Sequence, residues 1–206
     1  MKFVLVASLG INGLTMANEP AKVVGDAAKG KAVSTTCVAC HGADGNSVTA
    51  IWPKIAGQGD AYIIKQLNDF RSGSRVEASM TPMAKAIASD EDVLHLAAYF
   101  SSQKTKLATA NEDKVKLGEA IYRGGNLTTG VAACAACHGP TGSGNVAAKF
   151  PQVAGQHAQY TVIQLKAFKS GKRNNDVGEI MRGIAKNMTE EEMEAVAEYI
   201  SGLRSK

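Results

Sequence analysis

Four cysteines and two histidines stand in two copies of the pattern C-x-x-C-H. The first copy runs from Cys37 to His41 and the second from Cys134 to His138, and the chain contains no other cysteine. Two residues between the thiols suit one helical turn, which places both sulfurs on one side with the imidazole beside them. Such a site can attach a c-type haem, because the thiols bond to its vinyl groups and the histidine supplies an axial nitrogen to iron. The predicted attachment residues are Cys37, Cys40, Cys134 and Cys137, and the predicted proximal iron ligands are His41 and His138.

Two other uses of paired cysteines fit the spacing less well. A zinc ribbon keeps its two C-x-x-C pairs roughly 15–20 residues apart, whereas Cys134 follows Cys40 by 94 residues. A thioredoxin-type redox pair lies where a strand meets a helix, and nothing near either motif alternates like a strand. The sequence therefore predicts two covalently bound haem c groups.

The two motifs belong to a tandem repeat. The segment Trp52–Arg75 matches Phe150–Arg173 at a constant offset of 98 residues, and Met80–Asp92 matches Met181–Met193 at an offset of 101. A repeat of this kind indicates two homologous domains, each with one cysteine motif.

Each repeat shows helical periodicity only, so the predicted fold class is all-α. In the middle of each repeat, Tyr, Leu and Phe side chains share one face at helical spacing, which indicates an amphipathic helix. Later in each repeat, a Ser or Thr precedes a run of acidic residues, as at the start of a helix. The expected helices cover Asp26–Thr36, Tyr62–Arg71, Val115–Tyr122 and Tyr160–Ser170, and two more begin at Ser89 and Thr189.

Residues 1–17 are expected to be a signal peptide. One lysine precedes an apolar run that ends in small residues, which is the pattern of an export signal. The run is shorter than the ~20 residues that cross a bilayer, so retention as a membrane anchor is the less favoured alternative. The rest of the chain is divided into domain 1 at 18–103, a polar linker at 104–113 and domain 2 at 114–206.

A methionine in each repeat is the expected sixth ligand of iron. An electron carrier gains from a coordinatively saturated iron, and methionine raises the reduction potential. The candidates are Met80 and Met83 in the first repeat and Met181, Met188 and Met193 in the second. The repeat register aligns Met80 with Met181, whereas none of the other three has a methionine as its counterpart. Because duplicated sites should use the shared position, Met80 and Met181 are the predicted ligands.

Together these features resemble the dihaem cytochrome c4 family over essentially the whole mature chain. The resemblance rests on the doubled C-x-x-C-H, the doubled P-x-[IV]-A-G-Q, the M-T-P-M segment and Tyr122–Gly125. It implies two tandem class I cytochrome c domains, each a small helical fold around one covalent haem, and a periplasmic location. It also implies that the carbonyls of Pro53 and Pro151 accept a hydrogen bond from the proximal histidines. A proline that merely turns the chain is the alternative.

The resemblance implies electron transfer toward a terminal oxidase, with a donor of the quinol–cytochrome c reductase type. Peripheral membrane association is a further expectation. One alternative is the dihaem cytochrome subunit of a sulfide-type flavoprotein dehydrogenase. A dihaem enzyme of the peroxidase or thiosulfate-oxidising kind fits less well, because it needs an open or unusual sixth position and both repeats offer a methionine. No acid–base residue is required, so no catalytic residue is assigned and the protein is not expected to be an enzyme.

Composition and charge give less information about function than the motifs do. The chain is 45% hydrophobic and 20% charged with a formal net charge of +4, which excludes wholesale disorder and a multi-span membrane protein. No basic nucleic-acid footprint exists. A local basic cluster could orient docking, although a solvated helical face is the favoured interpretation. The cluster consists of Lys166, Lys169, Lys172 and Arg173.

Four further side chains are candidates for a role at the haem sites. His95 and His157 do not repeat, so neither is expected to be a ligand. Tyr62 and Tyr160 do repeat, and donation to haem propionates and simple packing are equal alternatives for them.

Overall fold

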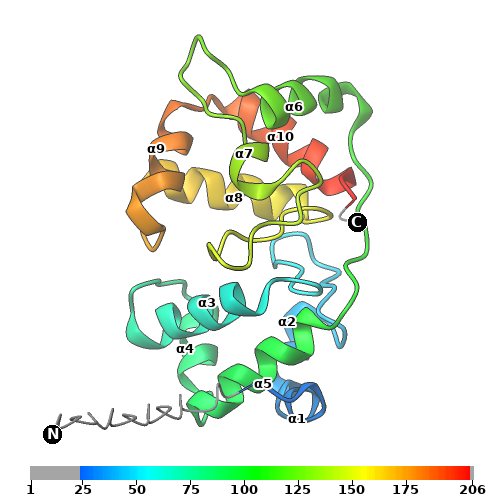
Figure 1. The fold of residues 1–206 in the computed structure, drawn as a ribbon, viewed down its shortest axis with the longest axis vertical. Coiled ribbons are helices and arrows are strands. Elements are labelled where there is room, and N and C mark those ends of the chain that lie inside the picture. Colours follow the sequence, from blue (N-terminus) through cyan, green and yellow to red (C-terminus); the bar gives the residue numbers. More distant parts are fainter. Residues whose placement is uncertain (1–23, 205–206) are drawn as a thin grey trace, which may run out of the picture.

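The computed structural model describes residues 24–204, which form two stacked helical units joined by one extended segment (Figure 1). The expected signal peptide at 1–17 lies outside the described residues. Between residues 24 and 204 there is no β-strand, only the isolated antiparallel bridges Asn126–Val131 and Asn145–Phe150. The prediction of an all-α fold is confirmed.

The two units repeat one order of helices. The first unit contains α1 (Ala27–Val33), α2 (Thr35–His41), α3 (Asp60–Ser72), α4 (Met80–Lys85) and α5 (Asp90–Ser101). The second unit contains α6 (Glu112–Gly124), α7 (Ala135–His138), α8 (Ala158–Lys169), the 3-10 turn η1 (Val177–Glu179), α9 (Ile180–Asn187) and α10 (Glu190–Gly202).

The last helix of each unit begins where the sequence predicts. The Ser89 side chain accepts a hydrogen bond from the backbone N–H of Asp92 at 3.0 Å and so caps α5. At the start of α10, Thr189 and Glu192 form a reciprocal capping box. These caps fix the start of the helix that supplies much of each core.

Glycines let the first and last helices of each unit cross closely. A Cβ built on Gly30 in α1 would lie 2.0 Å from the carbonyl oxygen of His95 in α5. A Cβ built on Gly118 in α6 would lie 2.0 Å from the carbonyl oxygen of Ala195 in α10. The helix that leads into each cysteine motif is therefore held against the last helix of its unit.

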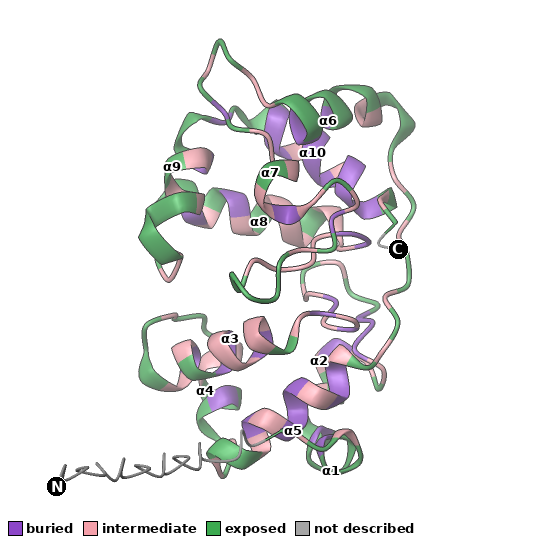
Figure 2. Ribbon diagram, viewed as in Figure 1, coloured by how far each residue is buried: buried purple, intermediate pink, exposed green. Residues whose placement is uncertain are grey.

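Each unit has its own hydrophobic core, seen as the buried faces of the crossing helices in Figure 2. Helices α3 and α5 supply most of the first core, and α6, α8 and α10 supply most of the second. Cys37 and Met80 pack against the first core, and Cys134 and Met181 pack against the second. Both predicted sites thus lie at the edge of an apolar cluster.

The helices of the structure differ from the predicted ones in three respects. Helix α6 begins at Glu112, inside the predicted linker at 104–113, because the Asn111 side chain accepts a hydrogen bond from a backbone N–H of the first turn. The single helix expected over Asp26–Thr36 is interrupted at Ser34, which separates α1 from α2. The short helices α4 and α9, of 6 and 8 residues, are not among the predicted helices, because helical periodicity is read over windows of roughly 11–18 residues.

Candidate haem-binding sites

His41 ends α2 and His138 ends α7, so each cysteine motif closes a helical turn with its imidazole. Nδ1 of His41 lies 2.9 Å from the carbonyl oxygen of Pro53, and Nδ1 of His138 lies 2.9 Å from that of Pro151. A carbonyl can only accept, so Nδ1 carries the proton in both rings and the lone pair of Nε2 is free. The role of the two prolines that the resemblance implied is confirmed.

The environment of both imidazoles suits binding of a metal. Each histidine is 9% exposed, and burial lowers the pKa of both His41 and His138 below the ordinary histidine value. A metal binds the neutral imidazole. Nε2 of neither ring makes a hydrogen bond, yet no buried side-chain nitrogen within 24–204 lacks a partner. Neither Nε2 atom is therefore fully buried, and both remain accessible to a ligand.

All four motif cysteines are free thiols that are half-buried. Burial raises the pKa of Cys37, and it raises the pKa of Cys134 to about 11. Thiols in such apolar surroundings are weak nucleophiles and poor candidates for a redox pair. An apolar core edge, two thiols and an open imidazole nitrogen occur together in each unit, and this donor set fits a covalent haem c.

The structure separates the five candidate methionines into two groups. Met80 is the first residue of α4 and Met181 the second residue of α9, and both lie half-buried at a core edge. Met188 and Met193 are 1% and 0% exposed and fill the second core, whereas Met83 is 43% exposed. Only Met80 and Met181 combine equivalent positions, core contact and a side open to a ligand.

His95 and His157 both make hydrogen bonds that stabilise the fold. His95 is buried, and its Nδ1 accepts a hydrogen bond from the backbone N–H of Asp26 at 2.9 Å, which fixes the start of α1 against α5. Nε2 of His157 lies 2.8 Å from the carbonyl oxygen of Ser47 in the other unit. Because these ring nitrogens are engaged, the structure supports the interpretation that neither residue is a ligand.

The two units meet through a pseudo-symmetric pair of glutamines. The side chain of Gln58 accepts from the backbone N–H of Gln152 at 2.8 Å and donates to its carbonyl at 2.9 Å. The side chain of Gln156 binds the N–H and carbonyl of Lys54 in the same way, at 2.9 Å and 2.8 Å. Lys54 and Gln152 each directly follow a proline that binds a proximal histidine. The interface therefore connects the two histidine sites.

In the sequence, these glutamines appear only as part of a repeated motif. Their signal was the doubled A-G-Q at an offset of 98 residues, but periodicity assigns no partner to a polar side chain in a loop. Their role emerges only once the two units are placed against each other.

A second cluster joins α3 to the segment that follows α8. Arg75 donates to Gln66 in its own unit at 2.7 Å and to Gln164 in the other unit at 3.0 Å. Arg173 reverses this pattern, donating to Gln164 at 2.8 Å and to Gln66 at 3.2 Å. Across the interface, Arg173 also donates to the hydroxyl of Tyr62 at 2.9 Å, and Arg75 donates to the hydroxyl of Tyr160 at 3.4 Å. Both tyrosines thus take part in interdomain hydrogen bonding.

The linker is also bound to the first unit. The side chain of Asn46 donates to the carbonyl of Lys104 at 2.9 Å and accepts from the backbone N–H of Lys106 at 2.7 Å. The Thr105 hydroxyl donates to the carbonyl of Ala56 at 2.6 Å and accepts from the Gln152 side chain at 2.8 Å. The connection between the units is fixed by these contacts.

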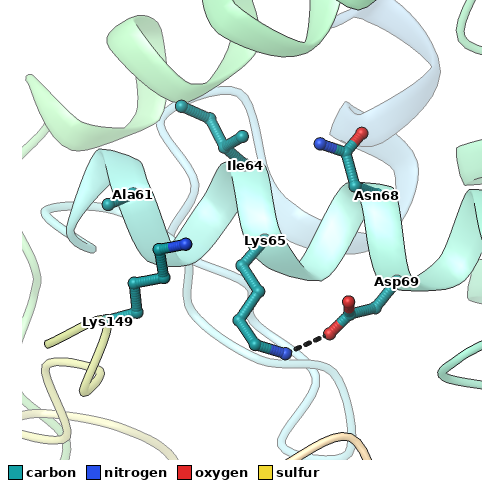
Figure 3. Close-up of a pocket in the computed structure, with 6 residues that line it drawn as sticks. All are labelled: Ala61, Ile64, Lys65, Asn68, Asp69 and Lys149. Atoms are coloured by element: carbon teal, nitrogen blue, oxygen red, sulfur yellow. Dashed lines mark hydrogen bonds and ion pairs between the residues drawn. The ribbon is translucent and has the colours of Figure 1, made fainter. Parts of the chain in front are cut away.

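A pocket beside α3, on the side of that helix that contacts the second unit, is separate from the histidine sites (Figure 3). Lys65 pairs there with Asp69 and donates to the carbonyl of Asn175 at 2.8 Å. Lys149 reaches the pocket from the second unit. None of the predicted cysteine, histidine or methionine ligands lines this pocket, so we assign no haem to it.

Two helical units, each with a C-x-x-C-H turn whose histidine is oriented by a proline carbonyl, define a tandem c-type cytochrome with two haem sites. The family model described as Cytochrome c matches residues 27–104 and 115–204. The crystal structure of reduced recombinant cytochrome c4 from Pseudomonas stutzeri is similar, with a TM-score of 0.85 and 44% sequence identity. That alignment covers 88% of this chain and 100% of that chain.

The chain belongs to the cytochrome c4 family, and it is a dihaem electron-transfer protein that binds two haem c groups. Cytochrome c4 of Azotobacter vinelandii is 43% identical to it, covering 97% of this chain and 96% of its own length. The thiosulfate dehydrogenase electron acceptor of Stutzerimonas stutzeri strain A1501 is 40% identical, covering 82% of this chain and 80% of its own length. The predicted tandem cytochrome c fold and the two haem c cofactors are confirmed.

Proposed function

We propose that this protein carries single electrons in a periplasmic respiratory chain, from a donor of the quinol–cytochrome c reductase type to a terminal oxidase. The proposal rests on two equivalent histidine–proline sites that are connected by one hydrogen-bonded interface. Both Nδ1 atoms lie 2.9 Å from their proline carbonyls, and the residue after each proline is bound by a glutamine of the other unit. Two equivalent sites in a fixed relation suit the relay of electrons.

We further propose that His41 and Met80 ligate one iron and that His138 and Met181 ligate the other, with the motif cysteines as covalent attachments. Bound haem supplies a one-electron couple at iron. The proline carbonyls hold the imidazoles in one plane and tautomer, which raises their basicity toward a metal. The Met80 and Met181 side chains, which pack against the core edges, would complete the coordination of iron, so no substrate position would be left open.

The periplasmic location and peripheral membrane association belong to the same proposal. No helix between residues 24 and 204 is long and apolar enough to cross a bilayer. Cell fractionation tests the location: the protein should appear in the periplasmic extract, or be released from membranes by a salt wash. Recovery only after detergent extraction would contradict peripheral association.

Reconstitution tests the respiratory route. Membranes that contain a terminal oxidase should oxidise the reduced protein, and cyanide should stop that oxidation. A purified quinol–cytochrome c reductase should reduce the oxidised protein in the presence of quinol, and a specific inhibitor should stop that reaction. If neither partner reacts with the protein faster than the uncatalysed background, the proposed route is wrong, although the haem spectra would be unaffected.

A second candidate function is that of electron acceptor for a thiosulfate dehydrogenase. The similarity to the electron acceptor from Stutzerimonas stutzeri, which extends over most of both chains, favours it. Mixing the oxidised protein with a thiosulfate dehydrogenase and thiosulfate would show reduction of both haems if this function holds. Without that enzyme, thiosulfate alone should reduce neither haem.

The remaining alternatives have their own tests. A flavoprotein dehydrogenase subunit would co-purify with a flavin-containing partner in a fixed ratio. A dihaem enzyme would show a high-spin oxidised haem, because it needs an open or unusual sixth position. The proposed methionine ligation instead requires low-spin spectra from both oxidised haems.

A further inference from the structure

Lys54 places a buried charge at the junction of the two units. The residue is 7% exposed, and its Nζ donates to the carbonyl of Gly155 in the other unit at 3.0 Å and to the carbonyl of Lys106 in the linker. Neither acceptor carries a charge. Lys54 forms no ion pair with any residue between 24 and 204. Its positive charge is therefore stabilised by dipoles without being neutralised by a carboxylate.

The pseudo-symmetric position in the second unit is neutral. Gln152 stands there, and its Nε2 donates to the Thr105 hydroxyl at 2.8 Å. The backbone groups of Lys54 and Gln152 are bound by equivalent glutamines with distances that agree within 0.1 Å. The two positions therefore have the same backbone hydrogen bonds but differ in side-chain charge, which is positive at Lys54 and absent at Gln152.

The position of Lys54 connects this difference to the haem sites. It directly follows Pro53, whose carbonyl orders the imidazole of His41. A fixed positive charge stabilises a reduced iron centre over the oxidised one, because reduction lowers the positive charge nearby by one unit. A buried charge is screened far less by solvent and salt than an exposed one, so its influence extends further into the protein.

We propose that Lys54 is a positioning residue that makes the two otherwise equivalent haem sites electrostatically different, because it places one uncompensated positive charge on one side of their junction. The inference rests on the proposed function, in which both irons have the same ligand types. Identical ligand sets would otherwise give the sites similar reduction potentials. The side chain also joins the first unit, the linker and the second unit through two carbonyls.

Redox titration of the intact dihaem protein tests the proposal. Lys54→Gln removes the charge and copies the residue of the other unit, whereas Lys54→Met also removes the hydrogen-bond donors. Both variants should lower the potential of at least one haem and change the equilibrium constant for electron exchange between the haems several-fold. Lys104→Gln, the same charge change at an exposed linker site, should leave both potentials unchanged.

The double variant Lys54→Gln with Gln152→Lys moves the charge to the pseudo-symmetric position. Relative to the parent protein, it should restore the sum of the two potentials while changing their difference in the same direction as Lys54→Gln and about twice as far. Potentials of Lys54→Gln equal to those of Lys104→Gln would overturn the proposal. A change in Lys54→Met alone would also overturn it, because the donors and not the charge would then be responsible. Failure of the proposed ligation would instead appear in the spectra of the unmodified protein.

Discussion

The close crossing of α6 and α10 predicts a large effect of one added methyl group. Gly118 is buried, and a Cβ there would lie 2.0 Å from the carbonyl oxygen of Ala195 and 2.8 Å from Cβ of Tyr199. Non-bonded heavy atoms pack at about 3.5 Å, so the two helices would have to separate by about 1.5 Å at this point. Overpacking of this kind costs roughly 1–3 kcal/mol or more, which exceeds the ~1 kcal/mol that alanine gains over glycine in helix propensity. We expect Gly118→Ala to lower the free energy of unfolding by about 2 kcal/mol.

Gly124→Ala is the matched control in the same helix, because nothing lies within 4 Å of a Cβ built at that position. It should be neutral or slightly stabilising. Urea unfolding of the holoprotein, followed by far-UV circular dichroism and by haem absorption, compares the two variants. With a slope of about 2 kcal/mol per molar urea, a loss of 2 kcal/mol lowers the midpoint by about 1 M. If Gly118→Ala unfolds at the same urea concentration as the parent protein, the glycine does not set the crossing and the reasoning fails.

Three other substitutions should change the haem spectrum, the acid stability or the interface between the units. Met80→Leu should abolish the methionine-to-ferric-iron charge-transfer absorption of one haem and lower its potential, whereas Met83→Leu should change neither and cost under ~1.5 kcal/mol; the reverse result would mean that the repeat register selects the wrong methionine. The hydrogen bond from Lys106 lowers the pKa of Asp44 to about 2. Because this folded-state pKa lies below the ordinary value of 3.8, the contact stabilises the fold above about pH 4, and that stabilisation is lost as the pH falls toward 2. Asp44→Asn should therefore flatten the acid limb of a stability–pH profile, and an unchanged limb would refute the assignment. Gln58→Ala leaves two backbone groups of the other unit without partners, so we expect a loss of ~2 kcal/mol from the interface, visible in calorimetry as a separation of the two unfolding transitions; a thermogram like that of the parent would contradict it.

The sequence could predict those parts of the sites that depend on residues close together in the chain. The C-x-x-C-H turn is set by helical geometry over five residues, and the caps at Ser89 and Thr189 depend on the next three positions. The bonds from His41 and His138 to their prolines span only 12 and 13 residues, and the resemblance pointed to them. The repeat register selects Met80 and Met181 from within each repeat, and their ligation of iron stays a prediction.

Contacts between the units were beyond the reach of such reasoning. Gln58 and Gln152 are 94 residues apart, and His157 and Ser47 are 110 apart. Whether a polar loop residue binds water or a distant backbone depends on how two folded units pack. The periodicity of nearby residues contains no information about that packing. The same applies to Lys54, whose charged side chain would be expected at the surface but becomes buried once the second unit and the linker cover it.

The linker explains why a duplicated interface of this kind cannot be fully symmetric. A linear chain joins its two units only once, so the pseudo-symmetric counterpart of the linker does not exist. Thr105 therefore binds the Ala56 carbonyl and the Gln152 side chain on one side only, and Lys106 accepts from Lys54 there. The asymmetric hydrogen bonds of these interface residues occur where the linker passes. Two haem sites with the same proposed ligand types thus acquire different surroundings from chain connectivity itself, which is why a difference between their potentials should be sought at the junction rather than among the proposed ligands.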